Sequence, residues 1–310
     1  MDTRRDDRAV SEIIGTILVI AIAVSVATSV LAWYLPTQAA SNDYRYQGAL
    51  VQSFLSMDSG VAGGGLVEGE QLSFPVAQGI AGIPPFSGPE PTSISILNSS
   101  PVESVSLSIL VDFTYLSNST SSHAYLNLSI AGSGSLASGY YTDGAQPLFV
   151  YLEDTSVVLD YIGGSVYCRG VSPVSASSSN LSVSMISYVG RDTAYSSDTE
   201  SDVVMTVENT TQLSLESGSI TTIDGTAVEI GRIDMLSLNY TITSPAASAL
   251  NSMMQQYFNS TAFQDSSASW HLGALATVTL SGDTIHIEGI SGSLLKGLQF
   301  RASTLYVVSL

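Results

Sequence analysis

Apolar residues run without a charge from Ile13 to Leu35, directly behind the charged leader MDTRRDDR. At 23 residues the run is long enough to cross a bilayer as a helix, which takes about 20 residues. The leader holds three arginines, and the next basic residue is Arg45. Because positive charge tends to stay on the cytoplasmic side, this pattern predicts an N-terminus inside the cell and the remaining chain outside.

A cleaved secretory signal is the alternative interpretation of this run. Thr37-Gln38-Ala39 resembles a weak small-residue cleavage site. The apolar part of such a signal is about 7–15 residues long, and the run here is longer. The length therefore favours a retained helix.

A second helical pattern follows Pro36, where we expect the first segment to kink or end. From Asn42 to Met57, four apolar side chains recur at spacings of four, four and three residues, which places them on one helical face; they are Tyr46, Leu50, Phe54 and Met57. The pattern predicts a stalk helix that carries a head outside the membrane.

Beyond the stalk the pattern changes to the two-residue period of β-strands. From Val105 to Tyr115, apolar residues alternate with Ser, Asp and Thr almost throughout, as in a strand with one face on a core. Further strands are predicted at 124–130, 148–162, 181–185, 203–208, 211–216, 226–243, 274–280, 284–290 and 303–309. Many short strands with Gly and Ser turns predict a β-sandwich or a barrel-like ectodomain.

One segment of the head has a helical pattern instead. Ser244-Pro245 is a good helix start, and apolar residues recur along 245–258, so we expect one helix packed on the sheet. The predicted organisation is a leader (1–8), a helix and stalk (9–57), a Gly/Pro-rich linker (58–92) and a β-rich domain (93–310).

The leader–helix junction reads Arg8-Ala9-Val10-Ser11-Glu12-Ile13-Ile14-Gly15-Thr16. This junction resembles the N-terminus of archaeal type IV pilin-like proteins, which carry a class III signal peptide. The resemblance covers residues 1 to about 40. It implies that a prepilin peptidase-like enzyme cuts between Arg8 and Ala9 and leaves the helix on the mature protein. It also makes Glu12 a candidate for pairing with other pilin-like subunits.

Small residues recur every four positions in the apolar run, at Ala21, Ser25 and Ser29. Such a ladder lets helix backbones approach closely, and it makes these residues candidates for helix pairing. A plain membrane anchor rich in small residues fits the same pattern.

The chain carries 27 acidic and nine basic residues, a net charge of −18, and Lys296 is its single lysine. Nucleic-acid binding is therefore disfavoured, because it needs basic patches against phosphate. An acidic surface keeps a head soluble and away from anionic lipid.

Seven of the nine Asn residues stand in Asn-x-Ser/Thr, and all seven lie in the predicted exterior domain. We expect several of them to be glycosylated, although a Ser/Thr-rich surface also inflates the count. The candidates are Asn98, Asn118, Asn127, Asn180, Asn209, Asn239 and Asn259.

Catalytic and metal-binding patterns are weak. His286 and Glu288 share one face of a predicted strand, which is more typical of a surface pair than of a metal site. An acidic cluster near residue 200 lacks EF-hand spacing; it comprises Asp192, Asp198, Glu200 and Asp202. Cys168 has no partner for an internal disulfide. We therefore predict no catalytic residues, no metal and no cofactor.

The sequence as a whole predicts a non-enzymatic pilin-like cell-surface protein. It would be a single-pass membrane protein, or a subunit of a surface filament, with a glycosylated β-rich ectodomain for surface structure or adhesion. Its partners would be membrane lipid, the processing enzyme and other pilin-like subunits. The alternative is a membrane-anchored binding module for polysaccharide or an envelope protein, and an ectoenzyme ranks third.

Overall fold

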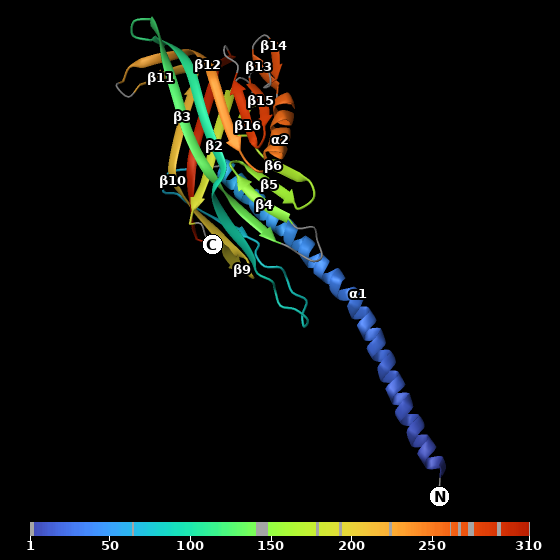
Figure 1. The fold of residues 1–310 in the computed structure, drawn as a ribbon. Helices are drawn as coiled ribbons and strands as arrows, with labels where there is room; N and C mark the ends of the chain where they lie inside the picture. Colours follow the sequence, from blue (N-terminus) through green and yellow to red (C-terminus); the bar gives the residue numbers. More distant parts are fainter. Residues whose placement is uncertain are drawn as a thin grey trace.

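The computed structural model describes residues 3–63, 65–140, 148–177, 180–191, 194–222, 225–260, 262–265, 268–271, 276–289 and 293–309. It is mainly β, with a long N-terminal helix, α1 (Thr3–Gly63), and a second helix, α2 (Ala247–Ser260). Figure 1 shows α1 projecting from the head, so that the N-terminus lies far from the strands. These features confirm the predicted fold class.

Two β-sheets form the head, and the smaller has five strands. Its order is β1 (Gln71–Val76), β10 (Ser201–Glu216), β18 (Gly297–Ser309), β8 (Asn180–Gly190) and β7 (Val174–Ser177). Neighbours are antiparallel except β18 and β8, which are parallel. The predicted strands 203–208 and 211–216 are therefore parts of one strand, β10.

The larger sheet has eleven strands and curls around the other elements. Its main path is β15 (Ala276–Ser281), β16 (Thr284–Gly289), β12 (Ala227–Thr243), β2 (Thr92–Tyr115), β3 (Thr120–Tyr140), β4 (Leu148–Glu153), β5 (Ser156–Tyr161) and β6 (Val166–Gly170). Off this path, β11 (Gly218–Thr221) and β17 (Ser293–Leu295) pair with β12, and β9 (Tyr195–Ser197) pairs with β2. A separate hairpin joins β13 (Ala262–Asp265) to β14 (Ala268–His271).

A bulge in β2 keeps both halves of this long strand directed at the core. The pairing with β3 passes from Leu97–Ser135 to Val102–Ser133, so that β2 carries extra residues there. Without them the strict alternation would turn one half of the strand toward solvent. With them, Ile96 and Val105 are both buried.

Two apolar clusters make up the core. The first lies among the two sheets and α2, where Val105, Met185, Tyr240 and Phe300 are buried. The second surrounds the C-terminal half of α1 and includes residues of β4, β5, β8 and β10. The expected helix at 245–258 is confirmed as α2, displaced by two residues, and Ser244 caps it by accepting a 3.0 Å hydrogen bond from the amide of Ala246.

The structure differs from the predicted organisation in two places. The helix does not end at Pro36, because α1 continues through this residue to Gly63. The Thr37 hydroxyl, one residue after this proline, donates to the Trp33 carbonyl at 2.8 Å. In addition, the predicted linker 58–92 contains the last turns of α1 and the whole of β1.

Candidate functional site

The N-terminal half of α1 presents apolar side chains that no other part of the described structure covers. From residue 14 to 34 they are almost all exposed, with Trp33 at 71%. This segment is long and apolar enough to cross a membrane. An apolar surface of this extent is rare on a soluble monomer and marks contact with lipid or another protein.

Polar side chains in this apolar half are satisfied within the helix. Ser25 donates to the Ala21 carbonyl and Ser29 donates to the Ser25 carbonyl, both at 2.7 Å, and Thr28 donates to Val24 at 2.9 Å. A hydroxyl that bonds its own helix needs no water, which is what a segment in hydrocarbon requires. The side chains of the ladder Ala21, Ser25 and Ser29 are therefore small and exposed, and both serine hydroxyls are hydrogen-bonded within the helix.

The predicted processing site lies at the start of the same helix. Arg8, Ala9 and Glu12 all belong to the helical backbone of α1. Their side chains are outside the described set, so the roles predicted for them stay predictions.

The C-terminal half of α1 is built into the head. The predicted apolar face is buried: Tyr46 is 5% exposed, and Leu50, Phe54 and Met57 are fully covered. Tyr46 donates a 2.8 Å hydrogen bond to the Thr92 hydroxyl of β2. The apolar half of α1 and the head thus belong to one continuous helix, whose C-terminal half is part of the core of the head.

Further hydrogen bonds fix the helix at several levels. The side-chain Nδ2 of Asn42 donates a 2.7 Å hydrogen bond to the Ala81 carbonyl. Near the other end, the Arg301 guanidinium of β18 donates to the carbonyl of Ala62 at 3.1 Å. The helix is therefore fixed to the head along about 30 Å, at 1.5 Å per residue.

Six of the seven sequon asparagines are exposed on the head; they are Asn118, Asn127, Asn180, Asn209, Asn239 and Asn259. Asn98 is different, because it lies in the β2 bulge and its side chain is partly buried. The side-chain Nδ2 of Asn98 donates to the backbone carbonyl of Gly190, and its Oδ1 accepts from the backbone N–H of Gly190, both at 3.0 Å. A glycan on Asn98 would disrupt this pair.

We expect the six exposed sequons to be open to modification and Asn98 to stay unmodified. Mass spectrometry of glycopeptides from the native protein measures this directly. A glycan on Asn98, or bare peptides at all six other sites, would contradict the expectation.

Sequence reasoning missed a group of buried carboxyls at the centre of the head. Glu103 of β2 and Asp154 of the β4–β5 turn are each 2% exposed, and the Tyr240 hydroxyl lies 3.2 Å from a carboxylate oxygen of both. Because the hydroxyl carries one proton, protonation of one carboxyl would let both carboxyl groups form a hydrogen bond with Tyr240. The Ile186 amide also donates to Asp154 at 2.7 Å.

Desolvation dominates the electrostatics of these acids. Burial raises the pKa of Asp154 to about 7, although the hydrogen bonds from Ile186 and Tyr240 oppose it. Burial and the neighbouring Asp154 charge raise the pKa of Glu103 well above its usual range.

Two more acids flank this pair. Burial raises the pKa of Glu153 to about 6, against a 2.7 Å hydrogen bond from Ser244. Burial also raises the pKa of Asp58 on α1 to about 7. The other titratable groups coupled to these acids are Tyr188 of β8, Cys168 of β6 and the half-buried Arg301 of β18. Since substrate cannot reach Glu103 or Asp154, we interpret the cluster as structural.

The sequence carried a signal for two of these residues. Glu103 is two residues before Val105, on the core side of the predicted alternation. Asp58 is four residues after Phe54, on the buried helical face. The strand alternation and the helical spacing place both residues on a core face. An acidic side chain at such a position was the signal of a buried carboxyl.

The remaining chemical candidates are not brought together. His286 lies 3.3 Å from the Thr241 hydroxyl, and Glu288 is exposed. Asp192 falls outside the described residues, and Asp198, Glu200 and Asp202 are exposed. Among the residues that the structure describes, no group of three His, Cys, Asp or Glu could hold a metal ion.

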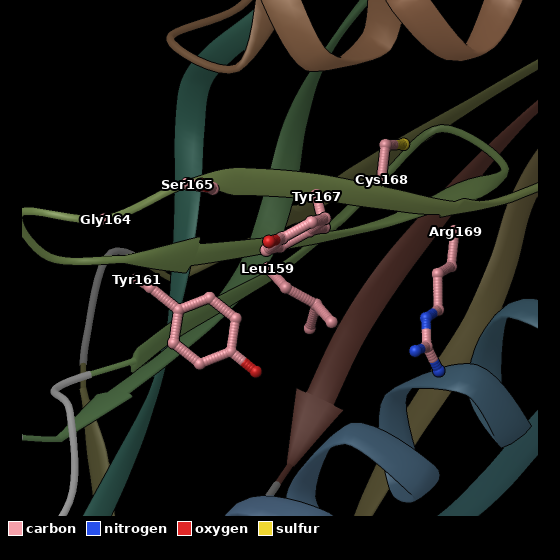
Figure 2. A pocket seen from close by; sticks show the side chains of 7 residues that line it. All are labelled: Leu159, Tyr161, Gly164, Ser165, Tyr167, Cys168 and Arg169. Atoms are coloured by element: carbon pink, nitrogen blue, oxygen red, sulfur yellow. The ribbon is translucent and has the colours of Figure 1, made fainter.

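A shallow hollow of about 520 Å³ lies along the edge strand β6. Figure 2 shows Arg169 pointing toward the α1 ribbon and Cys168 pointing the opposite way. Burial raises the pKa of the Cys168 thiol to about 12, so it is not a reactive thiolate near neutral pH.

Comparison with protein-family models, with curated proteins and with solved structures finds no match for this chain.

Proposed function

We propose that the chain is an archaeal type IV pilin-like surface protein without enzymatic activity, held by its N-terminal helix. The observation that carries this proposal is the division of α1 into two halves. One half is apolar and uncovered, and the other is buried in a β-rich head. A helix of this kind attaches a rigid domain to a hydrophobic phase.

The charge pattern supports a defined orientation. The three leader arginines precede the apolar half, and the head beyond it carries most of the negative charge. Positive charge is retained on the cytoplasmic side, so the head lies outside the cell. Exposed sequons on the head agree with an exported glycoprotein.

The uncovered half of α1 has two possible environments, lipid or a bundle of identical helices. The ladder of Ala21, Ser25 and Ser29 would allow close helix contact in either one. Assembly with other pilin-like subunits is therefore part of the proposal, and adhesion or surface structure is the role of the head.

The competing function is a membrane-anchored binding module that never assembles. A polar cavity of about 600 Å³ where α1 ends over the smaller sheet favours it. The two functions share the anchor and differ in whether the helix pairs.

Processing at the leader tests the proposal. We expect the mature protein to begin at Ala9 and to keep its apolar helix, as N-terminal sequencing or peptide mass mapping of the native protein would show. Replacing Arg8 with Asp should impair the cleavage. A mature start near Ala40 would identify an ordinary secretory signal and contradict the pilin-like assignment.

A further inference from the structure

The polar cavity lies where α1 stops short on the outer face of the five-stranded sheet. In β8, Leu181 and Val183 point into the core, so Ser182 and Ser184 point to the opposite face. The end of α1 forms one wall with Asp58 and Ser59, and the segment 171–173 forms another.

Strand register arranges the cavity floor as two polar rows. Gln212 of β10 pairs with Arg301 of β18, which pairs with Ser184 of β8. The next row is Gln299 of β18, Ser182 of β8 and Ser175 of β7. All six residues line the cavity, and the side chains of one row lie about 5 Å apart.

Two buried side-chain oxygens of wall residues have no hydrogen-bond partner among the residues that the structure describes. They are Oδ1 of Asp58 and Oγ of Ser172, whose residues are 6% and 5% exposed. A buried polar atom without a partner destabilises the folded state. Such atoms on the lining of a cavity are explained when something in the cavity bonds them.

The wall that carries Ser172 is held in place by backbone contacts. Thr155 donates its hydroxyl to the Val171 carbonyl at 2.8 Å, and its own carbonyl accepts from the Val171 amide at 3.0 Å. The Ser184 amide donates to the Pro173 carbonyl at 2.8 Å. The cavity is therefore preformed.

The lining disfavours two ligand classes, divalent cations and phosphate groups. Among the described lining residues Asp58 is the single carboxyl, which is too few for a divalent cation such as Ca²⁺ with its six or more oxygen ligands. Arg301 is the single cation among these residues and shares the lining with that carboxyl, which disfavours a phosphate group. The serine hydroxyls and glutamine amides both donate and accept hydrogen bonds, as the hydroxyls of a sugar do.

We propose that this cavity binds one saccharide unit of a glycan, with Asp58, Arg301 and the two polar rows as its hydrogen-bonding partners. Its volume lies within the range of small-molecule sites, about 300–1,000 Å³. The site does not depend on processing or filament assembly, so it can fail while the proposed function holds.

The test uses the full-length protein in a detergent without a sugar headgroup. Glucose, galactose, mannose, N-acetylglucosamine and glucuronate are titrated to about 50 mM, and binding is followed by calorimetry and saturation-transfer NMR. A single polar unit should bind with a Kd of about 1 mM, since few atoms are involved. We expect at least one of the five to bind.

A matched pair of variants locates the binding. Ser182→Leu places a bulky side chain in the cavity and should weaken binding about ten-fold or more. Ser214→Leu is the control, because Ser214 pairs with Gln299 in the same sheet but is exposed and outside the lining. Both variants should keep the thermal unfolding of the parent.

Three results would overturn the proposal. The first is no binding of any of the five sugars, which would leave the cavity to water. The second is binding that Ser182→Leu does not change. The third is equal weakening by both variants, which would place the sugar elsewhere on the sheet.

Discussion

Replacing Phe54 with Ala should lower the free energy of unfolding by about 3–5 kcal/mol, the range for a large aromatic side chain removed from a packed core. Phe54 is fully buried among α1, β4 and β5 residues. The measurement is denaturant unfolding of the detergent-solubilised chain. Tyr44→Ala is the matched control, because Tyr44 lies on the same helix but is 61% exposed. Equal stability of the two variants would show that the helix does not belong to the core.

Truncation should give a larger effect than any point substitution in α1. A chain that starts at residue 93 loses the buried apolar side chains of α1, of which each Leu, Phe, Met or Val contributes about 1.5–3 kcal/mol. Together with the loss of β1, this exceeds the typical net stability of a domain, about 5–15 kcal/mol. We expect no cooperative unfolding for this chain, whereas a chain that starts at Thr37 keeps the buried half of α1 and should fold. A stable domain from residue 93 would contradict the fold described here.

The stability of the head should fall as pH rises from about 4 to about 7. Asp58 and Asp154 have pKa values raised to about 7 and Glu153 has a pKa raised to about 6. The unfolded chain releases these protons near pH 4, so it binds fewer protons than the folded state across this window. The stabilisation that comes from the raised pKa values of these carboxyls is complete below pH 4 and is lost as pH rises. It contributes about 3 kcal/mol or more to the free energy of unfolding.

Denaturant unfolding at a series of pH values tests this dependence. Glu103→Gln should flatten it, because the neutral amide can still accept from Tyr240 and never ionises. The variant should be more stable than the parent at pH 8, and this gain should vanish near pH 4. The control is Glu208→Gln, since Glu208 is exposed on β10. A parent protein that is more stable at pH 8 than at pH 4 would contradict the role given to the buried acids.

This pH dependence gives the acidic composition a structural meaning. The net charge of −18 shows an excess of acid without showing where it lies. Among the described residues the structure buries six carboxyls, and protonation of Asp58, Glu103, Glu153 and Asp154 removes the cost of burying their charge. We therefore expect the head to be more stable at acidic pH, where its interior carries less negative charge.

Local periodicity was sufficient for most elements. The alternation around Val105, the helical spacing from Tyr46 to Met57 and the cap at Ser244 all correspond to observed structure. These patterns depend on near neighbours along the chain. The turn at Gly282 between β15 and β16, where Gly282 has a φ of +61°, was predictable for the same reason.

Features set by distant residues were not predictable in this way. The linker prediction failed at α1 and β1, because β1 gains its order from pairing with β10, about 130 residues later. The polar cavity needs β7, β8, β10 and β18 in register, which one strand cannot show. The periodic patterns place Asp58 and Glu103 on core faces. That both belong to one group of buried carboxyls depends on the folded chain and cannot be read from these patterns.

We propose that the apolar half of α1 holds the head outside the cell. Trypsin treatment of intact cells, followed by peptide mapping, tests it most directly, because Arg191 and Lys296 are exposed on the head. We predict that the peptides of residues 46–310 are lost from intact cells while the helix peptide stays with the membrane. Protection of the head in intact cells, with cleavage only after lysis, would contradict the claim.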